Sequence, residues 1–220
     1  VTLTDALAAG AGNTGHELGR GAPHLLVRQL SCPVGEVEVA IDYAPRPEYG
    51  LIRPILTAVP GGVTARGGAD WLVLSSPVPL LTRGATASGR AALRAGDTVL
   101  FGLHRSTLEQ TAARVQDQQE LAGWLAGTVE AWRSWSALHQ QYRGPWSDLV
   151  HHSGRVLRGL SFQPSGAIVA AATTSLPESA GGERNWDYRY SWVRDASFTM
   201  EALWVAACPD EASDFFAFLT

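Results

Sequence analysis

The segment from Asn185 to Asp195 contains the side-chain types with which proteins bind sugars. It reads NWDYRYSWVRD and continues into ASFTMEALW, and its aromatic and charged residues are Trp186, Tyr188, Tyr190, Trp192, Asp187, Arg189, Arg194 and Asp195. Flat aromatic rings stack on the faces of sugars, whereas carboxylates and guanidinium groups fix the positions of hydroxyl groups. The mixture favours a carbohydrate pocket. Composition alone leaves a second interpretation open, in which these aromatic residues and ion pairs anchor the start of a helix.

Two carboxylates in this segment, Asp187 and Asp195, are the first candidates for hydrolysis of a glycosidic bond. Such hydrolysis needs a general acid at the leaving oxygen and, for inversion of configuration, a second carboxylate that activates a water molecule. Both aspartates have an arginine close by in the sequence. A neighbouring cation lowers the pKa of a carboxyl group, whereas a general acid needs a raised pKa. We therefore expect neither aspartate to be the catalytic acid.

The order of the residues resembles the substrate-pocket segment of family-15 glycoside hydrolases, the group that contains glucoamylases, glucodextranases and bacterial trehalases. The runs NWDYRYSWVRDASFT and GAIVAAATTSLPES carry the resemblance, and TVEAWRSWSALHQQYRGPW extends it more loosely. The segments HLLVR and GEVEVAIDYAPRPEYG resemble the β-sandwich that precedes the catalytic barrel in bacterial members. The resemblance implies a fragment that lacks both ends of such an enzyme.

The resemblance also implies roles for individual residues of the motif. Four of them occupy the positions that hold the non-reducing glucose, and they are Tyr188, Trp192, Arg194 and Asp195. Within this set, Arg194 and Asp195 are expected to grip the outer hydroxyl groups of the sugar. Trp186 and Arg189 are candidates for the pocket wall, with a purely structural role as the alternative.

The resemblance also implies that the catalytic pair consists of glutamates in barrel loops beyond Thr220. Glu201 and Glu211 lie in helical runs that do not match those loops. We therefore expect no catalytic residue in this chain and no turnover by the chain alone. The full-length protein is expected to be an inverting hydrolase of terminal α-linked glucose in trehalose or α-glucans, without a cofactor. The alternatives are a non-catalytic carbohydrate-binding or domain-docking module, and a purely structural sandwich.

Composition excludes several other functions. The formal charge of −4 over 220 residues leaves no basic stripe for a nucleic acid. No apolar run approaches the ~20 residues of a membrane span. Cys32 and Cys208 match no metal or redox spacing, and the adjacent His151 and His152 would point in different directions on a helix, so no metal site is predicted. Without a visible signal peptide a cytoplasmic location is expected, and the opening VTLTDALA predicts that the true N-terminus lies further upstream.

The elements that must position the motif change character along the chain. Short apolar runs separated by Gly and Pro clusters predict a partial β-sandwich, or supersandwich, over residues 1–106. The clearest strand has apolar residues alternating with acidic ones, namely Val37, Val39 and Ile41 with Glu36, Glu38 and Asp42. A linker-helix region is predicted over residues 107–143. Residues 144–220 are predicted to begin an (α/α)6 catalytic barrel.

The linker helix is predicted from a stripe of large side chains between Leu108 and Tyr142. The stripe repeats at steps of three and four residues and consists of Leu121, Trp124, Leu125, Thr128, Trp132, Trp135, His139 and Tyr142. Tryptophans in such a stripe can stack on sugars, but large aromatic residues at helical spacing are usually core, so we favour a packing role. Further helices are predicted from Trp146 to about Gly159, from Ser191, and from Asp210 after Pro209.

Overall fold

The computed structural model describes residues 1–107, 113–205 and 209–220. Its contacts divide the chain into two compact units. The first consists of Val1–Ala11 with Gly21–Val129, and the second consists of Gly12–Arg20 with Glu130–Thr220.

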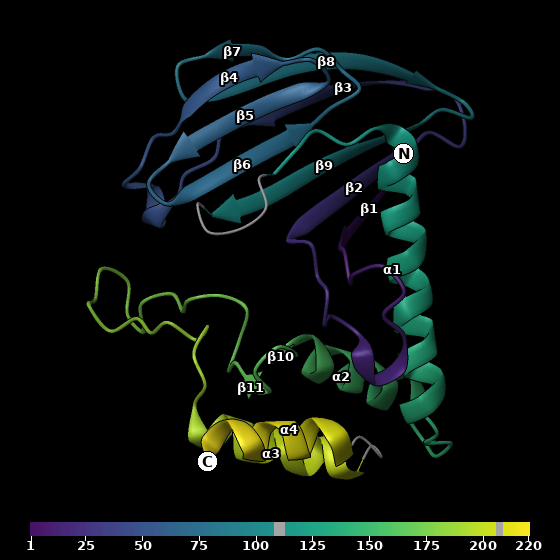
Figure 1. Cartoon of the computed structure of the whole chain (residues 1–220), viewed down its shortest axis with the longest axis vertical. Helices are drawn as coiled ribbons and strands as arrows, with labels where there is room; N and C mark the ends of the chain where they lie inside the picture. The colour runs from purple at the N-terminus through teal and green to yellow at the C-terminus, as the bar shows by residue number, and fades with distance from the viewer. Residues whose placement is uncertain (108–112, 206–208) are drawn as a thin grey trace. The chain divides into compact units, whose positions relative to one another are not determined.

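The first unit contains two antiparallel sheets. The larger has six strands in the order β1-β2-β9-β6-β5-β4 (Figure 1). Its strands are β1 (Thr2–Leu7), β2 (Leu25–Ser31), β4 (Ile55–Val59), β5 (Gly62–Gly67), β6 (Asp70–Ser75) and β9 (Thr98–Thr107). The smaller has the order β3-β8-β7, from β3 (Glu36–Tyr43), β7 (Leu81–Arg83) and β8 (Thr86–Arg94). A short 3-10 turn, η2 (Glu48–Gly50), follows β3.

Side chains from the two sheets line one pocket of about 430 Å³, so the sheets face each other as a sandwich. Phe101 and Leu103 reach it from β9, and Ile41 and Tyr43 reach it from β3. Burial raises the pKa of the Tyr43 phenol to about 12. Along β3 every second residue is exposed and the residues between them are half-buried, which confirms the predicted alternation.

The first part of helix α1 (Gln118–His139) covers the opposite face of the larger sheet. Leu121 is fully buried in a cluster with Leu25 and Val27 of β2 and Leu100 of β9. A Cβ atom on Gly102 would lie 2.5 Å from Leu121 Cδ2, so a glycine is needed where the helix meets the strand. The helix therefore extends the core of the sandwich.

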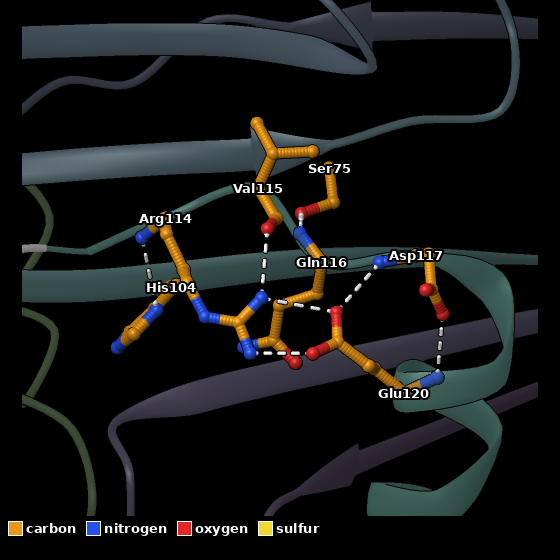
Figure 2. Close-up of polar contacts among 7 residues, drawn as sticks. All are labelled: Ser75, His104, Arg114, Val115, Gln116, Asp117 and Glu120. Atoms are coloured by element: carbon orange, nitrogen blue, oxygen red, sulfur yellow. Dashed lines mark hydrogen bonds and ion pairs between the residues drawn. The ribbon is translucent and has the colours of Figure 1, made fainter.

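Polar contacts fix the point at which α1 begins (Figure 2). The Glu120 N–H donates to Asp117 Oδ1 at 2.8 Å, and the Asp117 N–H donates to Glu120 Oε2 at 3.0 Å. This reciprocal pair is a capping box, which satisfies two amides that the first helical turn leaves without partners. Arg114 forms an ion pair with Glu120, and the buried Ser75 hydroxyl accepts the Gln116 N–H at 2.9 Å. The backbone before the helix is thus held to the sheet.

The second unit is mainly helical. It contains the 3-10 turn η1 (Gly15–Glu17), the remainder of α1, and the helices α2 (Ser147–Gly159), α3 (Val193–Val205) and α4 (Pro209–Leu219). A small hairpin pairs β10 (Ser161–Phe162) with β11 (Ala167–Ile168). Ile168, Ala196 and Phe215 form a buried cluster that joins the hairpin to α3 and α4 (Figure 1).

The predicted change from strands to helices is confirmed, because the strands of both sheets end by Thr107 and the helices α1 to α4 begin at Gln118 or later. Between Val1 and Leu103 the described helical elements are only the two 3-10 turns. The core interpretation of the tryptophan stripe is also confirmed, since Leu121 and Trp135 are fully buried.

The prediction of helix up to Tyr142 was wrong, because α1 ends at His139 and Tyr142 is 47% exposed. At the other end, residues 113–117 are not helical because the capping box starts the helix at Gln118. Leu108 and Cys208 lie outside the described residues. The boundaries at 106 and 143 and the (α/α)6 barrel stay predictions. Within the described ranges, every helix is too short or too polar to cross a lipid bilayer.

Candidate functional site

Three backbone hydrogen bonds connect the motif to the segment before it, and the two segments share one isolated antiparallel bridge, between Thr174 and Asp187. The Ala170 N–H donates to Tyr190 O at 3.1 Å, the Ala171 N–H to Tyr188 O at 2.9 Å, and the Ser175 N–H to Trp186 O at 2.7 Å. The preceding segment contains bends and this one bridge rather than a continuous strand. Its small residues leave room for the larger side chains of the motif to lie on either side of the paired backbones.

The Trp192 ring packs against two other aromatic side chains of the motif. Its ring centroid lies 5.3 Å from that of Tyr188 and 6.4 Å from that of Trp186, with the Trp186 ring nearly perpendicular to it. These separations and angles are typical of favourable aromatic pairs. Trp186 is 45% exposed, so the cluster retains ring surface that a flat ligand can contact.

Two residues outside the predicted set hold Trp186 in place. The Ser175 hydroxyl accepts the Trp186 N–H at 2.6 Å, and the Trp186 indole Nε1–H donates to Glu178 Oε1 at 3.3 Å. Arg184 forms a longer ion pair with Glu178 across the same loop. The sequence signal for Ser175 and Glu178 is their place in the run TTSLPES, but their contact with Trp186 depends on the pairing of the two segments.

Arg189 is bound to Asp187 and also lines a pocket. Its guanidinium donates to both carboxylate oxygens of Asp187, at 2.9 Å and 2.7 Å, and its backbone N–H donates to Oδ1 at 3.0 Å. Arg189 also lines a pocket of about 630 Å³ together with Tyr190, Phe162 and Phe218. Tyr190 thereby lines a different surface from the Trp192 cluster.

Arg194 and Asp195 lie in the first turn of α3. Asp195 Oδ2 accepts from Arg194 Nε at 3.1 Å and lies 3.0 Å from Nη2. A carboxylate in the first turn of a helix is favoured by the positive end of the helix dipole. The guanidinium of Arg194 is 72% exposed, so both partners can exchange this pair for contacts with the hydroxyl groups of a ligand.

The structure therefore brings the six predicted residues together in part. Trp186, Tyr188 and Trp192 form one aromatic cluster, whereas Arg194 and Asp195 pair at the start of α3 and Arg189 pairs with Asp187. Their assignment to a sugar subsite stays a prediction. Glu211 is buried against Trp135, and the expected absence of a catalytic residue from the chain stays a prediction.

The chain thus combines a β-sandwich, a helical unit and a group of aromatic and charged residues at the start of a helix. Residues 147–220 match the sequence model of the family described as glycosyl hydrolases family 15. The chain is 34% identical to a trehalase of Mycobacterium tuberculosis over 206 residues, which are 90% of this chain and 30% of that protein.

Two archaeal proteins are similar as well. A trehalase of Thermoplasma volcanium is 31% identical over 87% of this chain and 30% of its own length. Trehalase 2 of Sulfolobus acidocaldarius is 48% identical over 75 residues, which are 34% of this chain and 13% of that protein. The resemblance to family-15 glycoside hydrolases is therefore confirmed, and the chain spans about 30% of the length of the first two relatives.

Proposed function

We propose that this chain is part of an inverting glycoside hydrolase that acts on terminal α-linked glucose, with trehalose as the first substrate to test. The observation that carries the proposal is the similarity to proteins named trehalase along 90% of the chain. Within the proposed enzyme, residues 144–220 begin an (α/α)6 barrel. Maltose and longer α-glucans are further candidate substrates.

Within this proposal the chain supplies part of the glucose subsite. Tyr188, Trp192 and Trp186 offer ring faces for the pyranose, and Asp195 accepts sugar O–H groups while Arg194 donates to their oxygen atoms. Arg189 stiffens the wall through Asp187. Asp187 and Asp195 accept hydrogen bonds from arginine side chains, an arrangement that suits positioning of a substrate.

The test is glucose release from trehalose by the full-length protein that contains this chain, followed by proton NMR. From trehalose an inverting enzyme releases one β-glucose, from the residue that water attacks, and one α-glucose, from the leaving residue, whereas a retaining enzyme releases two molecules of α-glucose. First formation of α-glucose alone from trehalose would contradict the inverting mechanism, and cleavage of neither trehalose nor maltose would contradict the activity itself. The 220-residue chain alone is expected to release no glucose above a mock-purified control, because it lacks the proposed acid and base.

A domain-docking module is the second candidate function, and one observation favours it. Phe198, Trp204 and Phe216 of α3 and α4 are each at least 65% exposed. Large exposed apolar side chains mark surfaces that bind other protein elements. Saccharide binding without turnover by the full-length protein would support a binding module over the enzyme.

A further inference from the structure

We propose that His16, His139 and Glu211 form a binding site for a divalent transition-metal ion, with zinc as the preferred ion. Each of the three residues offers one ligand atom, and these atoms lie within 4.8 Å of one another. His16 lies in η1, His139 is the last residue of α1, and Glu211 lies in the first turn of α4. All three belong to the second unit. Their separation along the chain explains why spacing in the sequence predicts no metal site.

Glu211 carries the strongest indication of a missing partner. Its side chain is 6% exposed, and its Oε1 atom accepts the Trp135 indole N–H at 2.9 Å. The other oxygen, Oε2, is buried and has no hydrogen-bond partner among the residues that the structure describes. Buried carboxylate oxygens are nearly always satisfied in proteins, and coordination of a cation would satisfy this one.

The two histidines present ring nitrogens from different segments. Their ring centroids are 4.6 Å apart, and His139 packs on Trp135 at 5.1 Å. His16 Nδ1 lies 2.9 Å from Asp210 Oδ2, which leaves His16 Nε2 as its nitrogen for an ion. A carboxylate on the second nitrogen of a ligating histidine orients the ring and makes it a stronger ligand. Asp210 is placed for this supporting role.

The charges around the site also favour a dication. Arg158 Nε lies 3.4 Å from Glu211 Oε1, and Arg158 Nη2 donates to Leu18 O at 2.6 Å. With neutral histidines, the two carboxylates of Glu211 and Asp210 outweigh the single guanidinium by one negative charge. The Leu18 carbonyl accepts one of the guanidinium N–H groups, so Glu211 does not engage the whole guanidinium. A divalent ion therefore enters a site of net negative charge.

Two imidazoles and one carboxylate form a donor set that zinc prefers, with water as a fourth ligand. Zinc–ligand distances of about 2.1 Å in a tetrahedron place the ligand atoms roughly 3.4 Å apart. Rotation of His16, whose side chain is 45% exposed, can close the remaining gap. Because the ligands come from η1, α1 and α4, the proposed role of the ion is to tie these three segments together.

The experiment measures zinc binding by the intact 220-residue chain. The protein is first stripped with EDTA, then dialysed against micromolar ZnCl₂, and its bound metal is quantified. The expected result is one zinc per chain, with no comparable retention of magnesium, which prefers oxygen ligands. A chain that retains no zinc under these conditions would overturn the proposal.

Three variants test which residues bind the zinc ion. His16→Asn should weaken zinc binding at least about a hundredfold, because it removes a ligand, and Asp210→Asn should weaken it about tenfold to a hundredfold. His152→Asn is the matched control, because this histidine is exposed on α2 and should leave the affinity unchanged. Asp210 is exposed, so its variant provides a comparison that does not depend on the folding of His16→Asn. If Asp210→Asn and folded His16→Asn both bind zinc with the affinity of the parent, the zinc binds elsewhere and the proposal is overturned.

Discussion

Two arginine–carboxylate pairs in the second unit have the same chemistry and opposite surroundings. The Arg158–Glu211 pair is almost completely buried, at 4% and 6% exposure, and its members also contact Leu18 and Trp135. The Arg194–Asp195 pair lies in the first turn of α3, at 72% and 35% exposure. The side chains of the first pair are shielded from water, whereas those of the second pair are in contact with it.

This difference separates a role in stability from a role in binding. Breaking a buried pair leaves a charge without compensation, which is strongly destabilising, whereas most exposed pairs contribute little to stability. An exposed pair can instead exchange its internal contact for a ligand. The comparison therefore predicts that Arg158 matters for folding and that Arg194 and Asp195 matter for the proposed reaction.

The largest expected effect is the loss of stability in Arg158→Ala. The substitution leaves the Glu211 carboxylate buried without its cation, so the free energy of unfolding should fall by about 3–5 kcal/mol. Arg194→Ala is the matched control, with an expected change of about 1 kcal/mol or less. Urea unfolding with EDTA present measures both variants without a contribution from bound metal. Similar losses in the two variants would remove the distinction between the pairs.

The next effect concerns Asp195→Asn in the full-length protein. If Asp195 holds the sugar more tightly in the transition state, kcat/KM for trehalose should fall on the order of a hundredfold or more, equivalent to ~3 kcal/mol. The melting temperature should stay close to that of the parent. Glu183→Gln, in the exposed loop before the motif, is the control and should change neither quantity. A lowered melting temperature with near-normal kinetics would assign Asp195 a structural role instead.

A smaller effect distinguishes the aspartate at the start of α1 from the aspartate at the start of α3. The carboxylate of Asp117 accepts a backbone N–H at the start of α1, whereas that of Asp195 contacts an arginine side chain. Asp117→Ala should therefore reduce the free energy of unfolding by about 1 kcal/mol. Gln119→Ala, an exposed neighbour, should have almost no effect. Equal unfolding curves for the Asp117 variant and the parent would show that the capping box contributes little.

The smallest expected effect is a pH dependence at the same helix start. Hydrogen bonds from Arg114 and the Asp117 N–H lower the pKa of Glu120 from 4.5 to about 2. As the pH falls, the Glu120 carboxyl group therefore takes up a proton in the unfolded chain before it does so in the folded protein. The contribution of Glu120 to stability is present above pH 4.5 and is lost as the pH falls towards 2. In Glu120→Gln the stability should decline less between these pH values. A decline identical to that of the parent would exclude Glu120 as its source.

The strands and helices could be predicted from the sequence because their signals are local. The alternation along Val37, Val39 and Ile41 is visible in the residues themselves, and so is the aspartate at 117 followed by a glutamate at 120, although the latter signal was missed. The apolar stripe extended the predicted helix to Tyr142 because periodicity alone does not show where a backbone turns away.

The candidate site could be predicted only as a list of residues. The order of the motif indicates Trp186, Tyr188 and Trp192, but their clustering depends on the pairing of residues 170–175 with 186–190. The partners of Glu211 could not be predicted at all. Trp135 and Arg158 are distant from it along the chain, and only the packing of helices brings them into contact.

The early segment Gly12–Arg20 has a consequence for the order in which the protein forms during synthesis. Its Gly15 N–H donates to Ser134 Oγ at 2.6 Å, and its Leu18 carbonyl accepts from Arg158, which lies 140 residues later. These contacts cannot form until the ribosome has released Ser134 and Arg158, so this segment must wait for partners that are made more than a hundred residues later. Contacts between such distant parts of a chain slow folding, because a long loop must close before they form. The second unit is therefore completed only after Arg158 has been made, long after its segment Gly12–Arg20.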